Sequence, residues 1–223
     1  MRETLTVDVP EKPRIREGKA FTRTEQKTIL CAAGSETNVR SNLGAARRWV
    51  PWLMAYSGAR CQEITQLRKE DIIVEDGITA MLLSPQAGTL KTKQGRRVPL
   101  HEDLIEQGFL HFVKGRRNGP LFCNPRIENA AGDPTNPKRL PGAILVNRLR
   151  DWVREELGVT DKEISPNHAW RHTFRARAAR HGMREHVIDA ICGHAPANEG
   201  RGYGTPTLED KAAELRKFPR YDF

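Results

Sequence analysis

The sequence predicts a mainly α-helical fold with a small antiparallel three-stranded β-sheet, in the α+β class. Apolar residues recur at helical spacing along most of the 223 residues, whereas β-rich runs occur in two places. One run, 72–83, contains Asp76-Gly77, a dipeptide typical of β-hairpin turns, and the other is 96–100. The sequence contains no repeat and no low-complexity tract, so we expect one domain over residues 21–223 after a flexible lead-in over residues 1–20.

The first two helices are predicted from their caps and their apolar spacing. A threonine, Thr22 or Thr24, precedes Glu25 and predicts a helix start at that point. A second helix is expected at about 43–56, and Pro51 within it indicates a kink or a later start.

The remaining elements alternate between helices and loops. Gly182 and Gly193 occupy positions that are typical of helix C-caps. The stretch 115–141 is rich in Gly, Pro and Asn, and we expect it to be a loop with one short strand near Leu121-Phe122. Further helices are expected at about 63–67, 102–114, 143–157, 168–181, 184–192 and 207–217.

The charge of the chain points to a polyanionic partner. There are 37 Lys and Arg against 28 Asp and Glu, which gives a formal net charge of +9. Residues 88–184 alone carry nineteen basic and ten acidic side chains, so the excess lies inside the predicted domain. A basic stretch within a folded domain most often binds nucleic acid, and the alternative is a merely solvated cationic surface.

The composition argues against several other classes of protein. No apolar run is long enough to span a bilayer, and the first 21 residues contain no apolar segment of a secretory signal. Four scattered cysteines without CxxC spacing argue against a disulfide framework or a zinc knuckle. They favour a reducing compartment, so we expect a cytoplasmic protein with no membrane partner. The cysteines are Cys31, Cys61, Cys123 and Cys192.

The segment NHAWRHTFRARAARHG brings basic side chains onto one face of a predicted helix. His168, Arg171, His172 and Arg175 are spaced i, i+3, i+4 and i+7, and the first two lie near the helix N-terminus. An imidazole, a guanidinium and free backbone N–H groups suit a phosphate oxygen. The alternative is a solvated basic helix that touches only the DNA backbone.

No metal ion and no other cofactor is expected. His168 and His172 have the HxxxH spacing of some metal sites, but Ala169 stands where a metalloprotease needs glutamate. The sequence also lacks a carboxylate cluster and a Cys/His quartet.

A histidine and a tyrosine follow in the segment ICGHAPANEGRGYG. His194 comes directly after the helix-ending Gly193, and Tyr203 lies nine residues later among glycines. Of the other two tyrosines, Tyr56 is on an apolar helix and is expected in the core, and Tyr221 is in the C-terminal tail. Taken alone, Tyr203 would be interpreted as an ordinary surface-loop residue.

Five fragments in one order change that interpretation. They are SGARCQEITQLRKEDI (57–72), KTKQGRRVPL (91–100), HAWRH (168–172), GH (193–194) and Tyr203. Together they resemble the catalytic domain of the tyrosine recombinase (phage integrase) family. Each fragment alone is common, but the five in this order extend over about 150 of the 223 residues, which makes the match specific.

The resemblance implies a role for each matched residue. Glu63 matches the acidic residue that steadies the first family arginine, and His172 has a supporting structural role. Lys91 matches the lysine of the hairpin turn, with Lys93 as the alternative. The implied catalytic residues are Arg60, Lys91, His168, Arg171, His194 and, as nucleophile, Tyr203. We also expect Lys93, Arg96, Arg97 and Arg175 to contact DNA.

The chemistry of a phosphodiester explains why such a set is needed. Two arginines can bind the negative non-bridging oxygens in the transition state, the task that Mg²⁺ performs in other enzymes. Lys91 can protonate the leaving 5′ oxygen, His168 can take the tyrosine proton, and His194 can hydrogen-bond the phosphate. A tyrosine is a weak nucleophile at its ordinary pKa of about 10, so it needs this help.

Two departures from the family pattern affect the prediction. Cys61-Gln62 replaces the smaller residues expected after Arg60, which affects packing more than mechanism. The family usually carries an N-terminal core-binding domain that closes around the DNA, and we expect it to be absent from this chain, as in a fragment or a short member.

The sequence therefore predicts the catalytic domain of a site-specific DNA recombinase, from a phage or a bacterial mobile element, that acts on double-stranded DNA. Self-assembly to a tetramer on paired DNA sites is expected. The helix at 207–217 is then either exchanged between protomers or packed on its own domain. The alternatives are a type IB topoisomerase-like nicking and closing activity, and a DNA-binding module that has lost catalysis.

Overall fold

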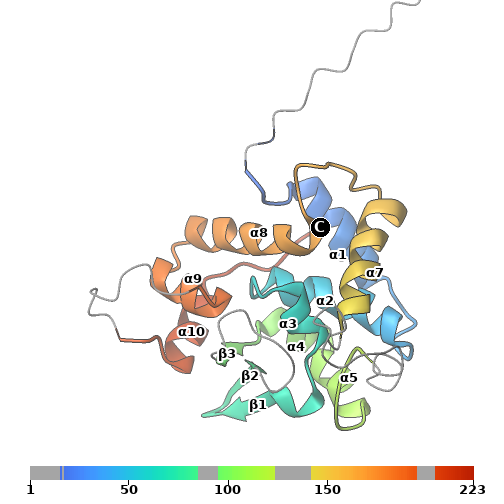
Figure 1. The fold of residues 1–223 in the computed structure, drawn as a ribbon. Helices are drawn as coiled ribbons and strands as arrows, with labels where there is room; N and C mark the ends of the chain where they lie inside the picture. The colour runs from blue at the N-terminus through green and yellow to red at the C-terminus, as the bar shows by residue number, and fades with distance from the viewer. Residues whose placement is uncertain (1–15, 17, 85–94, 124–141, 195–203) are drawn as a thin grey trace, which may run out of the picture.

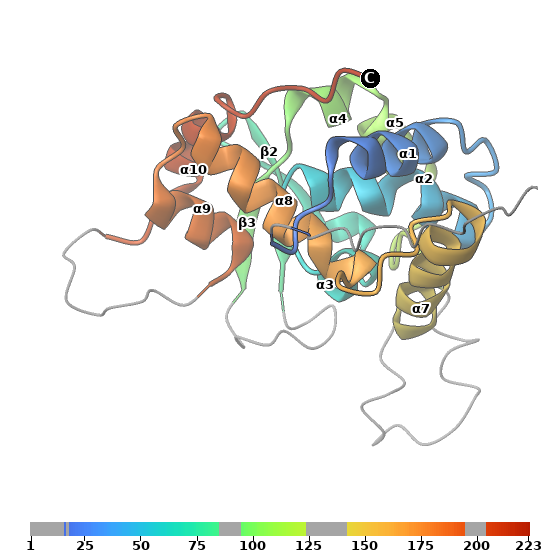
Figure 2. The same cartoon turned by 90° about the horizontal axis from the view of Figure 1, so that it is seen from above.

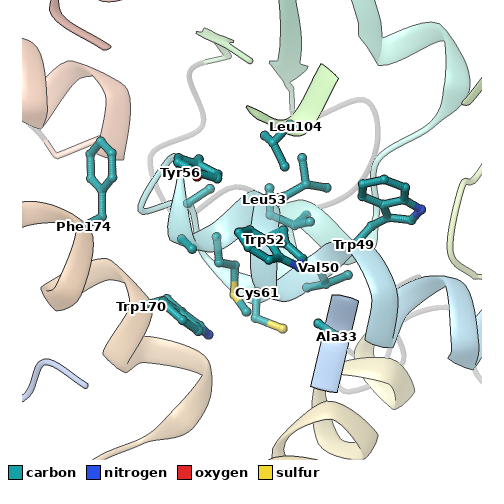
Figure 3. Packing of buried hydrophobic residues seen from close by; sticks show 14 of the residues in the cluster. Ala33, Trp49, Val50, Trp52, Leu53, Tyr56, Cys61, Leu104, Trp170 and Phe174 are labelled. Carbon is teal, nitrogen blue, oxygen red and sulfur yellow. The ribbon is translucent and has the colours of Figure 1, made fainter. Parts of the chain in front are cut away.

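The central helix of the fold, α2 (Asn42–Ala55), is buried on almost every side because its sequence is apolar around nearly its whole circumference. In this computed structural model, which describes residues 16, 18–84, 95–123, 142–194 and 204–223, α2 packs against four other helices. Figure 3 shows Trp49 and Trp52 of α2, and Tyr56 directly after it, in the core. The helix begins at Asn42 and continues through Pro51, so the expectation of a later start is wrong.

Helices surround α2, and the sheet lies beside α9 and α10 (Figures 1 and 2). This arrangement confirms the predicted α+β class. Three neighbours of α2, namely α1, α7 and α8, lie on the side away from the sheet. The helices are α1 (Arg23–Gly34), α2, α3 (Cys61–Thr65), α4 (Glu102–Glu106), α5 (Phe109–Gly115), α7 (Ala143–Asp151), α8 (Pro166–Arg180), α9 (Glu185–Cys192) and α10 (Leu208–Leu215).

The sheet has the order β1 (Ile72–Glu75), β2 (Ile78–Leu83), β3 (Arg96–Pro99), with both pairs antiparallel. The predicted hairpin turn is confirmed, since Asp76 and Gly77 both have positive φ, at 49° and 75°. Strand β3 packs against α9 and α10, so the strand that follows residues 85–94 is held next to two C-terminal helices.

Several predicted boundaries differ from those in the structure. The single helix expected at 102–114 is divided into α4 and α5 by Gly108, whose φ of 90° no helix interior adopts. The short strand expected near residues 121–122 is wrong, because the ladder there is an isolated bridge between Arg68 and Pro120. The helix expected at 143–157 ends as α7 and is followed by one π-helical turn, η4 (Trp152–Glu156).

Other expectations are confirmed. Thr22 caps α1 by accepting a hydrogen bond from the backbone N–H of Glu25 at 3.2 Å, and Glu25 reciprocates. Gly182 and Gly193 follow α8 and α9 with φ of 73°, the left-handed conformation that ends a helix. A 3-10 turn, η1 (Lys69–Asp71), connects the end of the α3 region to β1.

The lead-in is anchored where the structure describes it. The Arg16 side chain is 8% exposed and pairs with Glu25 of α1 and with Asp161, both at 2.8 Å. The expectation of a loose segment up to residue 20 therefore does not hold at Arg16, because two carboxylates and the carbonyl of Ala20 bind its guanidinium. Within the described ranges, no helix is long and apolar enough to cross a bilayer.

The C-terminal tail covers one face of the core with aromatic rings. Tyr56 stacks on His101 with ring centroids 4.2 Å apart, and Phe218 of the tail stacks on Phe174 of α8 at 5.0 Å. Tyr221 packs edge-on against Tyr56 at 5.3 Å. We call these five rings the aromatic cluster. The prediction that Tyr56 belongs to the core is confirmed, since it is 1% exposed.

Candidate active site

The first candidate arginine, Arg60, stands at the N-cap of α3. Its backbone N–H and its guanidinium both bind Glu63, at 2.9 and 3.0 Å. Glu63 lies one helical turn later, so the spacing that predicts a capping interaction also orients the Arg60 side chain. The Arg60 side chain is 24% exposed whereas that of Glu63 is 2% exposed, which leaves the guanidinium at the surface and its carboxylate partner inside.

Arg96 of β3 binds the same carboxylate from the other side. Its two terminal nitrogens contact the oxygens of Glu63 at 3.1 and 2.6 Å, and its Nε donates to the carbonyl of Ile191 at 2.9 Å. With its side chain 8% exposed, Arg96 lies beneath the site and joins three elements. All three nitrogens of its guanidinium bind protein groups, and the DNA contact that we expected of Arg96 stays a prediction.

Glu63 keeps its charge in this buried position. Burial alone would raise the pKa of the carboxyl, but the hydrogen bonds and charge of Arg96 and Arg60 lower it below its ordinary value. One carboxylate therefore holds two guanidiniums.

Arg171 is the deepest cation of the site. It lies on the sixth position of α8 and is 2% exposed. Its Nη1 donates to the carbonyl of Gly58 and its Nε to Nε2 of His194, each at 3.0 Å. Its Nη2 is buried and has no hydrogen-bond partner among the described residues. Burial first, and then the charge of Arg60, lower the pKa of Arg171.

The carbonyl of Gly58 can accept the hydrogen bond from Arg171 because of the backbone conformation of this glycine. Its φ of 60° is in the left-handed region, and a Cβ there would lie 2.8 Å from both Cys192 Sγ and a ring carbon of Phe174. The glycine of the SGAR motif is thus required both by conformation and by space. Burial raises the pKa of the Cys192 thiol to about 11, so this sulfur is an inert packing group.

His194 follows the C-cap of α9, whose residue Gly193 packs against the Arg96 guanidinium. Its Nδ1 lies 3.1 Å from Oδ1 of Asp189 and 2.7 Å from Nη1 of Arg175. Arg175 in turn forms an ion pair with Asp189. Arg175, which we expected to contact DNA, has a side chain that is 30% exposed and is held beside His194.

His168 and His172 lie one turn apart on α8, with ring centroids 5.0 Å apart. Burial, and then the positive charges of His172, Arg171, Arg60 and His194, lower the pKa of His168. His168 therefore stays neutral at a lower pH than an ordinary histidine does, and in this neutral form it is able to accept a proton. The structure describes no group of three or more His, Cys, Asp or Glu that could hold a metal ion.

The structure brings four of the six predicted catalytic residues to one junction between α3, α8 and α9. They are Arg60, His168, Arg171 and His194, joined by the supporting residues Glu63 and His172. Lys91, Lys93 and Tyr203 lie outside the described residues. Arg97, expected to contact DNA, has a side chain that is 47% exposed and pairs with Glu75 across the sheet.

One residue of this junction, Asp189, and one pairing, Glu63 with Arg96, escaped the sequence analysis. Asp189 gave no signal of its own, although Gly193 predicts a C-cap, and that cap returns the N–H of His194 to the Asp189 carbonyl at 2.9 Å. The contact between Glu63 and Arg96 joins residues 33 positions apart, and spacing within a single element cannot predict a contact at that separation. We call Arg60, Glu63, Arg96, Arg171, Arg175, Asp189 and His194 the polar junction.

Solved structures with the same fold include recombinases and an integrase. The integrase from mycobacterium phage Brujita has a TM-score of 0.57 at 15% identity, over 94% of this chain and 61% of its own. The XerH site-specific recombinase bound to its difH substrate, in a pre-cleavage complex, has a TM-score of 0.55 at 18% identity, over 80% and 48%. The XerA recombinase has a TM-score of 0.53 at 20% identity, over 96% and 68%.

These likenesses concern the fold, and this chain spans about half of the length of XerH. No protein with a curated description matches the chain in a sequence comparison. The sequence model of the phage integrase family, in contrast, matches residues 20–207, which include every residue of the polar junction and all five of the fragments that carried the resemblance. The chain belongs to the phage integrase family.

Proposed function

We propose that this chain is the catalytic domain of a tyrosine-type site-specific DNA recombinase. Tyr203 attacks a phosphodiester of double-stranded DNA, so that a 3′-phosphotyrosyl bond forms and the bond to the 5′ oxygen breaks. Attack by a 5′-hydroxyl reverses the step and rejoins the strand. The ester is conserved in the covalent link, so the reaction uses no ATP, and the arginines supply the positive charge that a metal ion supplies in other enzymes.

The observation that carries this proposal is the state of Arg171. A guanidinium 2% exposed, with no carboxylate bound to it among the described residues and with Nη2 unpartnered, is an expensive group to bury. A phosphate oxygen would supply the missing acceptor and the missing negative charge in one step.

The charges around Arg171 support the same ligand. The junction holds four guanidiniums, those of Arg60, Arg96, Arg171 and Arg175. They are balanced by two carboxylates, Glu63 and Asp189, which leaves an excess of positive charge where the surface opens at Arg60. Such preorganised donors stabilise the charge that develops on a phosphoryl group in the transition state.

The remaining roles follow from the chemistry of each group. His168, neutral and near the arginines, takes the proton of the nucleophilic tyrosine. His194 hydrogen-bonds a non-bridging oxygen beside Arg171. Lys91 protonates the leaving 5′ oxygen, and its position and that of Tyr203 rest on the sequence motifs alone.

Trapping of the covalent intermediate tests the proposal. A pool of short duplexes of randomised sequence, with 5′-bridging phosphorothiolates, should give a protein–DNA adduct that resists denaturation, because the thiolate product religates poorly. The adduct should form equally well in EDTA. Tyr203→Phe should form no adduct while binding DNA nearly normally, and an adduct with this variant would refute Tyr203 as the nucleophile.

The sulfur substrate also identifies the general acid. If Lys91 protonates the oxygen, Lys91→Ala should be inactive on the oxygen substrate and active on the sulfur substrate, because a thiolate leaves without a proton. Rescue of Lys93→Ala in place of Lys91→Ala would assign the role to Lys93.

Two further measurements test the proposal: one separates a recombinase from related activities, and the other tests phosphate binding. Exchange of strands between two duplexes, with a tetramer on the paired sites, distinguishes a recombinase from an enzyme that only nicks and closes DNA. The DNA affinity should fall steeply with salt, by about 0.9 log units per log unit of salt for each phosphate contact. Tight binding without salt dependence would contradict a phosphate-binding surface.

A further inference from the structure

Asp189 and Arg175 contact the side of His194 that faces away from Arg171. Nδ1 of His194 lies 3.1 Å from Oδ1 of Asp189, and Nη1 of Arg175 forms an ion pair with the same oxygen. All three side chains are between 25% and 37% exposed, so the group lies at the rim of the junction, open to solvent protons.

The hydrogen bonds determine which nitrogen of His194 carries the proton. Nε of Arg171 always carries a hydrogen, so Nε2 of His194 accepts it at 3.0 Å and is unprotonated. The neutral ring then has its hydrogen on Nδ1, and Oδ1 of Asp189 is the acceptor within reach. The 2.7 Å contact between Nδ1 and Nη1 of Arg175 therefore joins two donors, which is tolerated because both share the Asp189 carboxylate.

We propose that Asp189 and Arg175 are positioning residues that set the tautomer and the charge of His194. Asp189 accepts the Nδ1–H, so that Nε2 faces the phosphate site of Arg171. Arg175 neutralises Asp189, so that His194 stays uncharged until the site receives an anion. The identity of that anion as a DNA phosphate rests on the proposed function, whereas the pairing of His194 with Asp189 and Arg175 does not depend on it.

The charged groups around His194 act in opposite directions. Asp189 of α9 favours the imidazolium, whereas Arg171 and Arg175 of α8 oppose it. Arg96 of β3, which packs on Gly193, adds a third guanidinium nearby, whereas His168 of α8 is neutral. Burial first, and then the charges of Arg171 and Arg175, hold the pKa of His194 below its ordinary value.

Arrival of a phosphodiester would reverse this balance. A negative oxygen near Arg171 compensates the cations, so that Nε2 takes up a proton from solvent and changes from an acceptor for Arg171 into a donor to the phosphate. The Nδ1–H of His194 stays hydrogen-bonded to Asp189 throughout. Nε of Arg171 is then released toward the same anion, while Nη1 keeps its bond to the Gly58 carbonyl.

Two substitutions with opposite expected effects test the pairing. Asp189→Asn keeps an acceptor for Nδ1–H but removes the charge, so the His194 pKa should fall by about one unit, a tenfold loss of proton affinity. Arg175→Ala leaves Asp189 uncompensated, so the His194 pKa should rise by a similar amount. Nitrogen-15 NMR of the full chain without DNA reads both the pKa and the tautomer, which should be Nδ1–H in the wild type.

The rate of adduct formation at saturating DNA supplies the second readout. The alkaline limb of its pH profile should move down by about one unit for Asp189→Asn and up for Arg175→Ala. Matched controls are Asp222→Asn and Arg23→Ala, a surface pair whose side chains are 87% and 76% exposed. Neither control should change the pH profile.

Shifts of the His194 pKa in the same direction in both variants would overturn the proposal, because a merely structural loss moves both toward the ordinary value. A wild-type His194 protonated on Nε2 alone would overturn it as well. Failure of the wild type to form any adduct would instead refute the proposed function, since the NMR measurement needs no DNA.

Discussion

The polar junction and the aromatic cluster hold the same helix, α8, by different means. Arg171 joins the junction through hydrogen bonds to Gly58 and His194, and Phe174, one turn later, joins the cluster by stacking on Phe218. The junction holds four guanidiniums against two carboxylates, and one buried nitrogen, Nη2 of Arg171, has no partner among the described residues. The cluster buries its rings nearly completely. The comparison indicates that Arg171 serves reactivity and that Phe174, one turn later on α8, serves stability.

The largest effect should come from Arg171. Arg171→Ala should reduce adduct formation by at least ~10²–10³, because that is the typical cost of losing one donor to a transition-state oxyanion. Arg171→Lys should not restore activity, since an ammonium cannot reproduce the planar fork. Thermal unfolding of Arg171→Ala should show little loss of stability, because the substitution removes a buried and uncompensated charge. Strong destabilisation would show that Arg171 itself also stabilises the fold.

The opposite result is expected at Phe218 of the C-terminal tail, which stacks on Phe174 of α8. Phe218→Ala should lower the free energy of unfolding by about 3–5 kcal/mol, because the ring is 2% exposed and its removal leaves a cavity against Phe174. Adduct formation per folded molecule should change far less than for Arg171→Ala. Denaturant titration measures the first quantity, and Phe223→Ala, at an aromatic residue that is 41% exposed, is the matched control.

The sequence predicted these two regions to different extents. The helical spacing of His168 and Arg171 is local, so the motif placed both on one face of α8, as the structure confirms. The stacking of Phe218 on Phe174 joins residues 44 positions apart, and neither apolar spacing nor a motif indicates which face a tail will cover. The Glu63–Arg96 pair escaped for the same reason.

The same limit applies within the predicted elements. Gly108 divided one expected helix because a glycine can adopt a left-handed φ at no cost, and composition does not show whether it will. Pro51, which we expected to kink or delay α2, is accommodated because the helix is buried on nearly all sides and packing outweighs one missing hydrogen bond. Packing decided both outcomes, and packing is not visible in a single sequence.

A smaller effect should come from the base of the junction, where one substitution breaks an ion pair and a second repairs the stability. Arg96→Leu should lower the free energy of unfolding by about 3 kcal/mol, the low end for a broken buried pair, because Arg60 still compensates Glu63. The double variant Arg96→Leu/Glu63→Leu should recover most of that stability and still form little adduct, since Arg60 has then lost the group that orients it. Recovery of the adduct together with stability would show that Glu63 does not position Arg60.

The smallest effect should be a pH dependence of the aromatic cluster at His101. Burial, opposed by the hydrogen bond to the Phe218 carbonyl at 2.8 Å, lowers the His101 pKa in the folded state. Its Nδ1 accepts the backbone N–H of Asp103 at 3.2 Å, so the ring has no free lone pair for a second proton. A proton therefore binds His101 more tightly in the unfolded chain than in the folded protein. The stability that depends on neutral His101 is complete above the unfolded pKa of about 6.5, and it falls as the pH drops below that value.

His101→Gln should abolish this loss, because an amide donates to Phe218 and accepts from Asp103 without titrating. Between pH 7 and pH 5, the wild type should lose at most about 1.4 kcal/mol per pH unit more than the variant. Parallel denaturant titrations at each pH measure the difference, with the exposed His181→Gln as control. Equal acid sensitivity of wild type and His101→Gln would show that titrating groups outside the aromatic cluster carry the pH dependence.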